Sequence, residues 1–353
     1  MTPPLRVVQW ATGNIGSRSL RQVIEHPGLE LAGVYVTAAG GKAGKDAAEL
    51  CGLPAPAGVT ATSDADAALA GKPDCVLYMP AACDLDEVCR ILASGANIVT
   101  TRGEFHHPGS MKPSDAERVE AACAAGGTSI HSTGSSPGFI SEAVPAVLTS
   151  IQRRLDRLTI SEYADLSKRD SPDLLFNVMG FGGAPEKFDT RRFGFGAVAF
   201  GPSLRLTAEA LGLPLDDVTS TGEVAVAAED TVIAAGTLDA GTVAAQRVVV
   251  TGSRNGTPLM VFTANWYCTP RLTAPSGADT SEWTARQAGW TISVAGDAPL
   301  EVDIQFPFGL DRMAEMTPGY TANRAVNAVP YVCAAPPGIR TTIDLPQIVA
   351  RLG

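Results

Sequence analysis

The sequence predicts a two-domain α/β protein, in which a doubly wound parallel sheet is followed by an α+β domain built on a mainly antiparallel sheet. Three observations predict it. The chain has 353 residues, which is long for a single core. From residue 5 to about residue 150, apolar β-branched runs alternate with alanine-rich helical stretches, as in a parallel sheet covered by helices. Beyond that point strand-like runs follow one another with few helices between them, which indicates antiparallel pairing.

These patterns divide the chain into three expected segments. Residues 1–150 form the domain with the parallel sheet, and residues 151–319 form the α+β domain. Residues 320–353 form a helix and a tail that pack back on the first domain. We expect the strands of the first domain at Leu5–Trp10, Leu31–Val36, Asp74–Met79, Asn97–Thr101 and Thr128–His131.

Helix-start residues and helical periodicity mark two helices between these strands. They cover Asp84–Ser94 and Pro113–Ala125, with Asp84 and Ser114 as N-caps. In the second domain Arg254–Thr257 is a turn that predicts a hairpin. The strands expected there are Arg157–Tyr163, Gly222–Val232, Ala244–Gly252, Leu259–Tyr267, Trp290–Val294 and Leu300–Ile304, before a helix at Tyr320–Ala335.

Composition excludes several classes of function. The net charge is −10 and no basic run occurs, so we expect no nucleic-acid partner. No apolar stretch approaches the roughly 20 residues of a membrane span, and MTPPLRVVQW runs straight into a strand, so we expect no export leader. The seven cysteines include no CxxC pair and the four histidines lack metal-site spacing, so neither disulfides nor a metal site is expected. These features predict a cytoplasmic protein with free thiols.

The first strand ends in a glycine turn that resembles a dinucleotide fingerprint. Residues Ala11, Thr12, Gly13, Asn14, Ile15 and Gly16 match GxGxxG except at the first position, which is alanine. Gly13 would let the backbone approach a diphosphate, Gly16 would let the helix pack on the strand, and the helix N-terminus would hold the phosphates. A tight turn without a ligand is the alternative. The position between a strand and a helix favours a cofactor in a Rossmann domain.

The residues after the second strand favour NADP(H), while NAD(H) stays possible. An NAD site places an acid about 20 residues beyond the fingerprint, to bind the ribose hydroxyls. Here Thr37 and Lys42 or Lys45 follow the strand, and Asp46 lies too far along. A hydroxyl and an ammonium suit a 2′-phosphate better than a carboxylate would. The alternative is that the lysines only solvate a loop.

Glu104 is the candidate catalytic residue. It follows the strand ending at Thr101, and chemistry in a doubly wound sheet gathers beyond the carboxyl ends of the strands. We expect Phe105 and the nicotinamide to desolvate this carboxylate and raise its pKa. The alternative is a surface ion pair with Arg102 or a histidine. Three other residues at strand ends complete the expected cofactor contacts: Met79, Pro80 and Thr101.

Two groups of residues are candidates for a substrate pocket. Ser135, Pro137 and Phe139 lie in the small-residue loop after His131, where a structural crossover is the alternative. Four residues of the second domain could form an apolar substrate wall, although their spacing also fits ordinary core: Tyr163, Leu166, Phe176 and Met179.

Four stretches together resemble the dihydrodipicolinate reductase-like dehydrogenases, and most closely their 2,4-diaminopentanoate dehydrogenase and native amine dehydrogenase branch. They are VVQWATGNIG, NIVTTRGEF, HSTGSSPGF and NRAVNAVPYVCAAPPGIRTTIDLP. The resemblance implies NAD(P)-linked reversible conversion of an amine to a ketone or aldehyde and ammonium. The family glutamate matches Glu104, which would deprotonate ammonium or water and stabilise an iminium.

The sequence departs from true dihydrodipicolinate reductases, because His106-His107 is followed by PGSMKPSDAE and not by the lysine of that family. No arginine pair for an amino-acid carboxylate is evident, although Arg169, Arg191 and Arg192 are candidates. We therefore expect a hydrophobic or cyclic ketone or amine, with ammonium, as the partners. A reductase of a cyclic imine or enone without ammonia chemistry is the alternative, and a non-catalytic NADPH sensor is a distant one. A homodimer is expected.

Overall fold

The computed structural model describes residues 3–275, 277 and 279–352. The chain forms two compact units, which are described separately. Unit 1 contains the residues up to Ala143 and those from Thr317 onward, and unit 2 contains Val144–Met316. Within the part of the chain described, no helix is long and apolar enough to cross a membrane.

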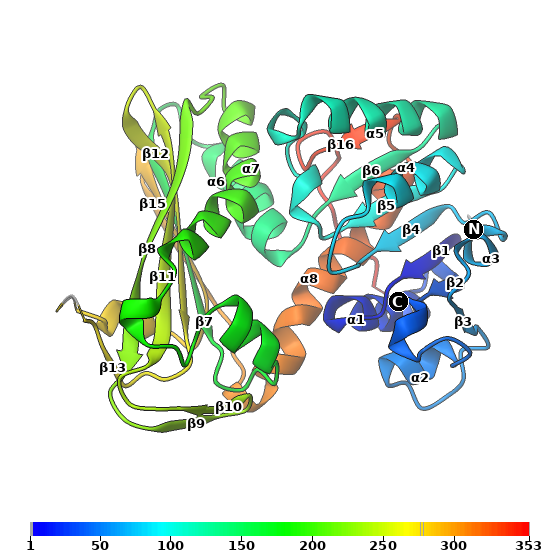
Figure 1. The fold of residues 1–353 in the computed structure, drawn as a ribbon. Helices are drawn as coiled ribbons and strands as arrows, with labels where there is room; N and C mark the ends of the chain where they lie inside the picture. The colour runs from blue at the N-terminus through cyan, green and yellow to red at the C-terminus, as the bar shows by residue number, and fades with distance from the viewer. Residues whose placement is uncertain (1–2, 276, 278, 353) are drawn as a thin grey trace. The chain divides into compact units, whose positions relative to one another are not determined.

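Unit 1 holds a seven-stranded sheet in which every pair of neighbours is parallel (Figure 1). The order β16-β6-β5-β4-β1-β2-β3 reverses direction between β1 and β4, as in a doubly wound fold. This confirms the predicted parallel sheet. The strands are β1 (Leu5–Trp10), β2 (Leu29–Tyr35), β3 (Ala61–Thr62), β4 (Cys75–Tyr78), β5 (Asn97–Thr100), β6 (Ser129–Ser132) and β16 (Gly338–Arg340).

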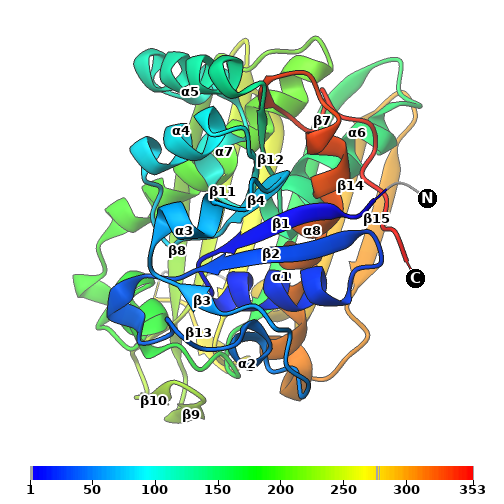
Figure 2. The same cartoon turned by 90° about the vertical axis from the view of Figure 1, so that its right-hand side faces the viewer.

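Helices cover both faces of this sheet, because successive strand residues point to opposite sides. Val8 and Val76 belong to one buried cluster with residues of α3, α4 and α5. Val7 and Leu77 belong to another with residues of α1 and α8. Figure 2 shows β1 and β2 side by side near α1. The helices are α1 (Asn14–Glu25), α2 (Ala47–Cys51), α3 (Ala65–Leu69), α4 (Leu85–Ala93), α5 (Pro113–Gly126) and α8 (Leu310–Cys333).

Helix starts were predicted with mixed success. Asp84 caps α4 as predicted, because its carboxylate accepts from the backbone N–H groups of Asp86 and Glu87. The prediction of Ser114 as a cap is wrong. Helix α5 begins at Pro113 after Lys112, because proline at the first helical position has its φ already set and needs no acceptor for an N–H. The predicted helix at Tyr320 begins earlier, at Leu310.

Unit 2 holds a second seven-stranded sheet, in the order β13-β8-β11-β12-β7-β14-β15. Among the described residues of this sheet, only β12 and β7 pair in parallel, which confirms the mainly antiparallel sheet. Strands β9 (Thr231–Ile233) and β10 (Gly236–Leu238) pair separately. The main strands are β7 (Leu155–Asp165), β8 (Asp217–Ala227), β11 (Val243–Arg254), β12 (Thr257–Tyr267), β13 (Leu272–Thr273), β14 (Ala288–Gly296) and β15 (Leu300–Gln305).

The predicted hairpin joins β11 to β12, where Asn255 and Gly256 both have positive φ. The predicted strand Gly222–Val232 is wrong as a single element. Strand β8 ends at Ala227 and β9 begins at Thr231, and Asp230 between them accepts from the backbone of Ala240.

Helix α7 (Gly194–Ala210) was not predicted, because its sequence is rich in glycine. It covers one face of the unit 2 sheet (Figure 1). A Cβ at Gly196 would lie 2.6 Å from Ser220 Oγ and 2.8 Å from Val248 Cγ1, so glycine permits the close approach. A short helix, α6 (Val144–Thr149), begins the unit.

Candidate active site

The turn between β1 and α1 has the geometry of a phosphate-binding loop. Ala11 has φ +69°, the left-handed conformation that glycine usually supplies at this first position. A Cβ at Gly16 would lie 2.2 Å from the Ala11 carbonyl oxygen, so the helix packs on the turn only with glycine there. A Cβ at Gly13 would meet no atom within 4 Å, which leaves open space beside the backbone.

The N-terminus of α1 is suited to an anion. Its N-cap is Gly13, with no capping side chain, and its first turn carries no acidic residue. The first backbone bond runs from Ser17 N to Gly13 O, so the preceding N–H groups of Asn14, Ile15 and Gly16 have no helical acceptor. Such groups and the helix dipole favour a bound phosphate, so these residues fit the diphosphate of a dinucleotide.

The loop after β2 adds a cation to this turn. Lys42 Nζ donates to Thr12 O at 2.7 Å and to Thr12 Oγ1 at 3.2 Å. Thr37 lies before a short 3₁₀ turn at Ala38–Gly40. Asp46, the acid considered above, is bonded to the backbone N–H groups of Ala48, Ala57 and Gly58, and these bonds lower its pKa. The carboxylate of Asp46 therefore stabilises the loop through these backbone hydrogen bonds.

The strand ends bring the next group of candidates to the same edge of the sheet. Met79 N donates to Trp10 O at 2.9 Å, which links the end of β4 to the end of β1 at the point where the strand order reverses. Thr101 Oγ1 lies 3.5 Å from Met79 Sδ, and Pro80 is partly exposed beside it in sequence. Ligands of doubly wound sheets bind at such a switch point.

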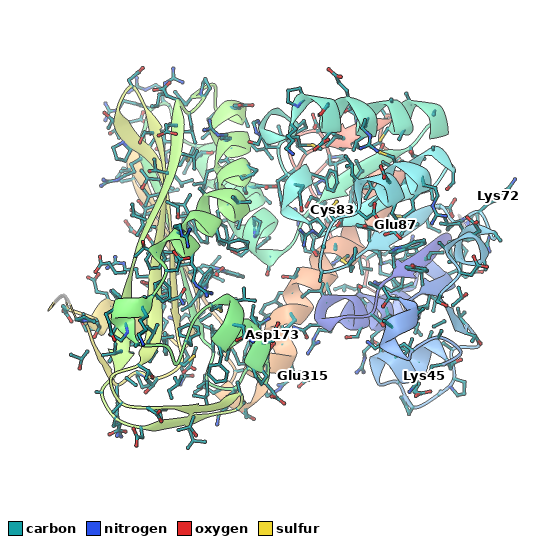
Figure 3. All side chains as sticks on the ribbon, viewed as in Figure 1. Lys45, Lys72, Cys83, Glu87, Asp173 and Glu315 are labelled. Atoms are coloured by element: carbon teal, nitrogen blue, oxygen red, sulfur yellow. The ribbon has the colours of Figure 1, made fainter. Side chains whose placement is uncertain are left out.

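Glu104 lies in a 3₁₀ turn, Gly103–Phe105, that follows β5. Its Oε1 is 2.6 Å from Arg102 Nη2, and 43% of its side chain is exposed. The structure thus has the ion pair that was the alternative to a desolvated carboxylate. Phe105 does not shield it, because the phenyl ring is fully buried in the core under α4 and α5. Burial raises the pKa of the Cys83 thiol, which is labelled in Figure 3, to about 11, and the charge of Glu104 adds to that rise.

A buried polar network lies behind the turn. His106 Nδ1 is 2.6 Å from Glu142 Oε1, and each of these side chains is 1% exposed. Thr342 Oγ1 donates to the other oxygen of Glu142. His107 points elsewhere, to Ser110 Oγ at 2.7 Å. The network therefore ties the Glu104 turn to the crossover and to the C-terminal tail.

The crossover after β6 contains the remaining candidates of unit 1. Ser135 Oγ is 2.7 Å from Thr321 Oγ1, and Phe139 N donates to Gly134 O at 2.8 Å. Pro137 follows a cis peptide and precedes Gly138, whose φ is +117°. Two buried hydroxyls here, Thr133 Oγ1 and Ser136 Oγ, have no hydrogen-bond partner among the described residues.

Unit 2 brings together three of the four predicted wall residues. Leu166 belongs to a buried cluster against which Phe176 and Met179 pack. Tyr163 does not join them. Arg286 Cζ lies 5.8 Å from its ring centroid, and strand alternation turns Tyr163 to the opposite face from its neighbours Glu162 and Ala164.

The sequence interpretation missed Glu162. Both of its carboxylate oxygens accept from tryptophan indoles, and its side chain lies on the face covered by α7. The signal that could have found it is the alternation of side chains along the strand. Ile160 and Ala164 are apolar and lie on one face, so Glu162 between them lies on that inward face too.

The candidate arginines for a substrate carboxylate are largely engaged within their own loop. Arg191 pairs with Asp189, and Arg192 Nη1 donates to Asn177 O at 2.8 Å. Arg169 begins the segment that leads to Phe176, and its backbone N–H donates to Leu166 O. Among the described residues, no group of three histidine, cysteine or acidic side chains could hold a metal ion.

Comparison with known proteins identifies related chains. The model of the 2,4-diaminopentanoate dehydrogenase C-terminal domain matches residues 139–353, more than half of the chain. An amine dehydrogenase of Streptomyces virginiae is 28% identical over 368 residues, covering 99% of each chain. The solved amine dehydrogenase from Mycobacterium smegmatis has a TM-score of 0.76 at 20% identity, over 99% of this chain and 98% of that one. GenD2 from gentamicin A biosynthesis, solved in complex with NAD, has a TM-score of 0.50 at 16% identity, over 93% and 87%. Both solved structures share the fold.

Proposed function

Because the chain belongs to the 2,4-diaminopentanoate dehydrogenase family, we propose that it is a nicotinamide-dependent amine dehydrogenase. In this reaction a ketone or aldehyde condenses with ammonia, loses water to form an iminium, and is reduced to an amine. The observation that carries the proposal is the carboxylate of Glu104, which follows β5 at the same carboxyl edge of the parallel sheet as the turn between β1 and α1. The names of the Streptomyces virginiae and Mycobacterium smegmatis relatives support it.

The proposed cofactor is NADP(H), with NAD(H) as the second choice. Bound there, it would supply or accept the hydride. The turn from Ala11 to Gly16 would hold the diphosphate, and Lys42 and Thr37 would face the 2′-phosphate. Met79, Pro80 and Thr101 would contact the nicotinamide end. The commitment of Asp46 to three backbone N–H groups supports this preference, because no free acid remains to bind a 2′-hydroxyl in that loop.

Glu104 has two roles in this proposal. Its carboxylate takes a proton from ammonium, which frees ammonia to attack the carbonyl carbon. The carboxyl group returns that proton to the hydroxyl of the addition product, which leaves as water, and the restored carboxylate stabilises the positive charge of the iminium. Arg102 holds the carboxylate by one guanidinium nitrogen and donates to Ala81 O at 2.6 Å with the other, so the pair is anchored to the loop after β4.

Each unit, taken by itself, contains residues that we propose as substrate contacts. In unit 1, Ser135, Pro137 and Phe139 belong to the crossover that contains two unpaired buried hydroxyls. In unit 2, Leu166, Phe176 and Met179 form one apolar cluster, which suits a carbon skeleton.

The experiment is NADPH oxidation with a panel of aliphatic, cyclic and keto-acid substrates, with and without ammonium, and identification of the product. Ammonium-dependent oxidation with an amine product is expected. Oxidation that is independent of ammonium would instead indicate a reductase of a C=N or C=C bond.

A homodimer is also part of the proposal. Helix α7 covers one face of the unit 2 sheet, while Thr159, Val249 and Val261 point to the other face and are partly exposed. A second copy would cover them across a two-fold axis. Light scattering after size-exclusion chromatography should give twice the 36.5 kDa chain mass.

A further inference from the structure

The 3₁₀ turn that carries Glu104 is anchored at both ends within unit 1. At its start, Arg102 N donates to Thr100 Oγ1 at 3.2 Å, and Ser132 Oγ donates to Arg102 O. At its end, the backbone N–H of His106 donates at 3.4 Å to the carbonyl of the first residue of the turn. Because 43% of the Glu104 side chain is exposed, its place depends on the residues that hold the turn.

The side chain of His106 is held by a buried carboxylate. Its Nδ1 lies 2.6 Å from Glu142 Oε1, and both side chains are 1% exposed. Because an ionised carboxylate only accepts, Nδ1 carries the proton and donates it. Thr342 Oγ1 donates to the other oxygen of Glu142. Three segments that are far apart in the sequence therefore meet at one carboxylate: the turn after β5, the crossover after β6 and the C-terminal tail.

Two different kinds of interaction stabilise the Glu142 carboxylate. The first is charge: burial lowers the pKa of Arg324 on α8, and the negative charge of Glu142 opposes that lowering. His131 offers no such charge at pH 7, because burial lowers its pKa to about 4. The second is direction, which comes from the hydrogen bonds of His106 and Thr342. Charge compensation and direction can therefore be removed separately.

A buried polar pair is a costly way to fill space in a core. Apolar side chains of similar volume are often as stable at such positions, or more so. Phe105, between Glu104 and His106, is already fully buried and holds the turn by apolar packing. Apolar packing has no direction, whereas a hydrogen bond to a buried carboxylate fixes the His106 ring in one orientation. The pair therefore adds direction to a turn that packing alone already holds in place.

We infer that Glu142, acting through His106, is a positioning residue for the Glu104 carboxylate. This role rests on the proposed function of Glu104. The buried hydrogen bond keeps the turn, and with it the carboxylate, in the geometry in which a proton is transferred. Thr342 orients Glu142 from the other side, so the C-terminal tail contributes to the site without touching the substrate.

The test uses two variants that differ in one hydrogen-bond donor. His106→Leu removes the Nδ1 donor, whereas His106→Asn keeps an N–H donor at the corresponding place in the side chain. His106→Leu should lower kcat for reductive amination by about tenfold and leave the KM for the ketone and the Kd of NADPH within about twofold. His106→Asn should keep kcat within about threefold. Ser110→Ala, which removes the hydroxyl partner of the neighbouring His107, is the matched control and should change neither kcat nor KM.

Glu142→Gln separates positioning from stability. The amide oxygen still accepts from His106, and the Thr342 hydroxyl can accept from the amide nitrogen, but the negative charge beside Arg324 is lost. The Tm should therefore fall while kcat stays within about threefold. Thr342→Val is a milder change that decides the question if His106→Leu does not fold, and it should lower kcat by about threefold at an unchanged KM.

Hydrogen–deuterium exchange gives a readout that needs no turnover. The backbone amides from Arg102 to His106 should exchange at least about fivefold faster in His106→Leu than in the parent protein, and at the parent rate in His106→Asn. The amides of β1 should exchange equally in all three proteins. If the parent protein shows no ammonium-dependent activity, the proposed function fails, and the exchange rates alone decide whether the buried pair positions the turn.

The outcomes are distinct. A loss of kcat and faster exchange in His106→Leu, both restored in His106→Asn, support the positioning role. An equal loss of kcat in both variants overturns it, because the imidazole itself would then be required. Unchanged exchange in His106→Leu also overturns it. So does a further loss of kcat when His106→Leu is added to Glu104→Gln, since a residue that acts through the Glu104 carboxylate has no effect once that carboxylate is removed.

Discussion

The guanidinium of Arg102 holds the carboxylate of Glu104, with Nη2 2.6 Å from Oε1. The contact is local, and it is partly exposed, so its contribution to stability is small. The contact matters because it orients the Glu104 carboxylate, since the same guanidinium also donates to the carbonyl of Ala81 after β4. The carboxylate is thereby fixed at the carboxyl edge of the sheet.

Replacing Arg102 by glutamine should lower kcat by about tenfold, because a loosely held carboxylate spends less time in a productive geometry. The Kd of NADPH should not change. Arg102→Lys should recover part of the rate, since an ammonium can still pair with the carboxylate. Arg90→Gln, which removes an exposed pair with Asp66, serves as control. Full activity in Arg102→Gln would show that this pair has no role in orienting Glu104.

Lys42→Ala should raise the Kd of NADPH by about tenfold and change that of NADH far less, because in the proposed site the lost ammonium would face only the 2′-phosphate. The control is Lys45→Ala, as Lys45 is paired with Glu49 on the helix that follows. Fluorescence titration of both cofactors gives the ratio. Equal losses for both cofactors would indicate that Lys42 only supports the Thr12 turn, to which it donates.

Ala11→Gly should stabilise the protein. Ala11 has φ +69°, a conformation that costs a non-glycine residue about 1–2 kcal/mol, and the greater chain entropy of glycine offsets part of the gain. A net gain of about 0.5–1 kcal/mol should raise Tm by about 1–3 °C. In contrast, Ala93→Gly in α4 should lower Tm, because the alanine there is helical. A fall in Tm for Ala11→Gly would show that the backbone of Ala11 is not strained.

The pH dependence of stability should include a contribution from His131. The ring is fully buried, and burial lowers its pKa from 6.5 to about 4. Between these two pH values the unfolded chain is protonated at His131 and the folded protein is not. The free energy of unfolding therefore falls by at most about 3 kcal/mol as the pH drops from about 6.5 to about 4. Urea unfolding at pH 7, 6 and 5 should show this loss, and His131→Asn should reduce it. An unchanged slope in the variant would contradict the role of His131.

Much of the first unit could be predicted from local patterns. Its strands are short continuous apolar runs, and the glycine turn and Glu104 follow directly from where those strands end. Helix α7 could not be predicted in this way. Its glycines disfavour a helix locally, and only the close contact of Gly196 with Ser220 and Val248 on the sheet explains them.

Candidate site residues could be predicted where their position follows from the end of a single strand. They were harder to predict where their position depends on contacts between distant segments or on the pairing of strands. His106 and Glu142 are far apart in the sequence, and nothing local indicates that they meet. Tyr163 was predicted to contact the substrate, but its neighbour Glu162 is the residue that faces the covered side of the sheet. Adjacent residues of a strand point to opposite faces, so an error of one position selects the wrong face. Register is set by partner strands, which the sequence pattern of one strand does not contain.

Glu104→Gln tests most directly whether Glu104 is the catalytic carboxylate of an ammonium-dependent dehydrogenase. Initial rates of NADPH oxidation would be measured with an accepted ketone and ammonium, together with the Kd of NADPH for both proteins. We expect kcat/KM for reductive amination to fall by at least about a hundredfold, while the Kd of NADPH stays the same. Amination by Glu104→Gln at the rate of the parent protein would contradict it.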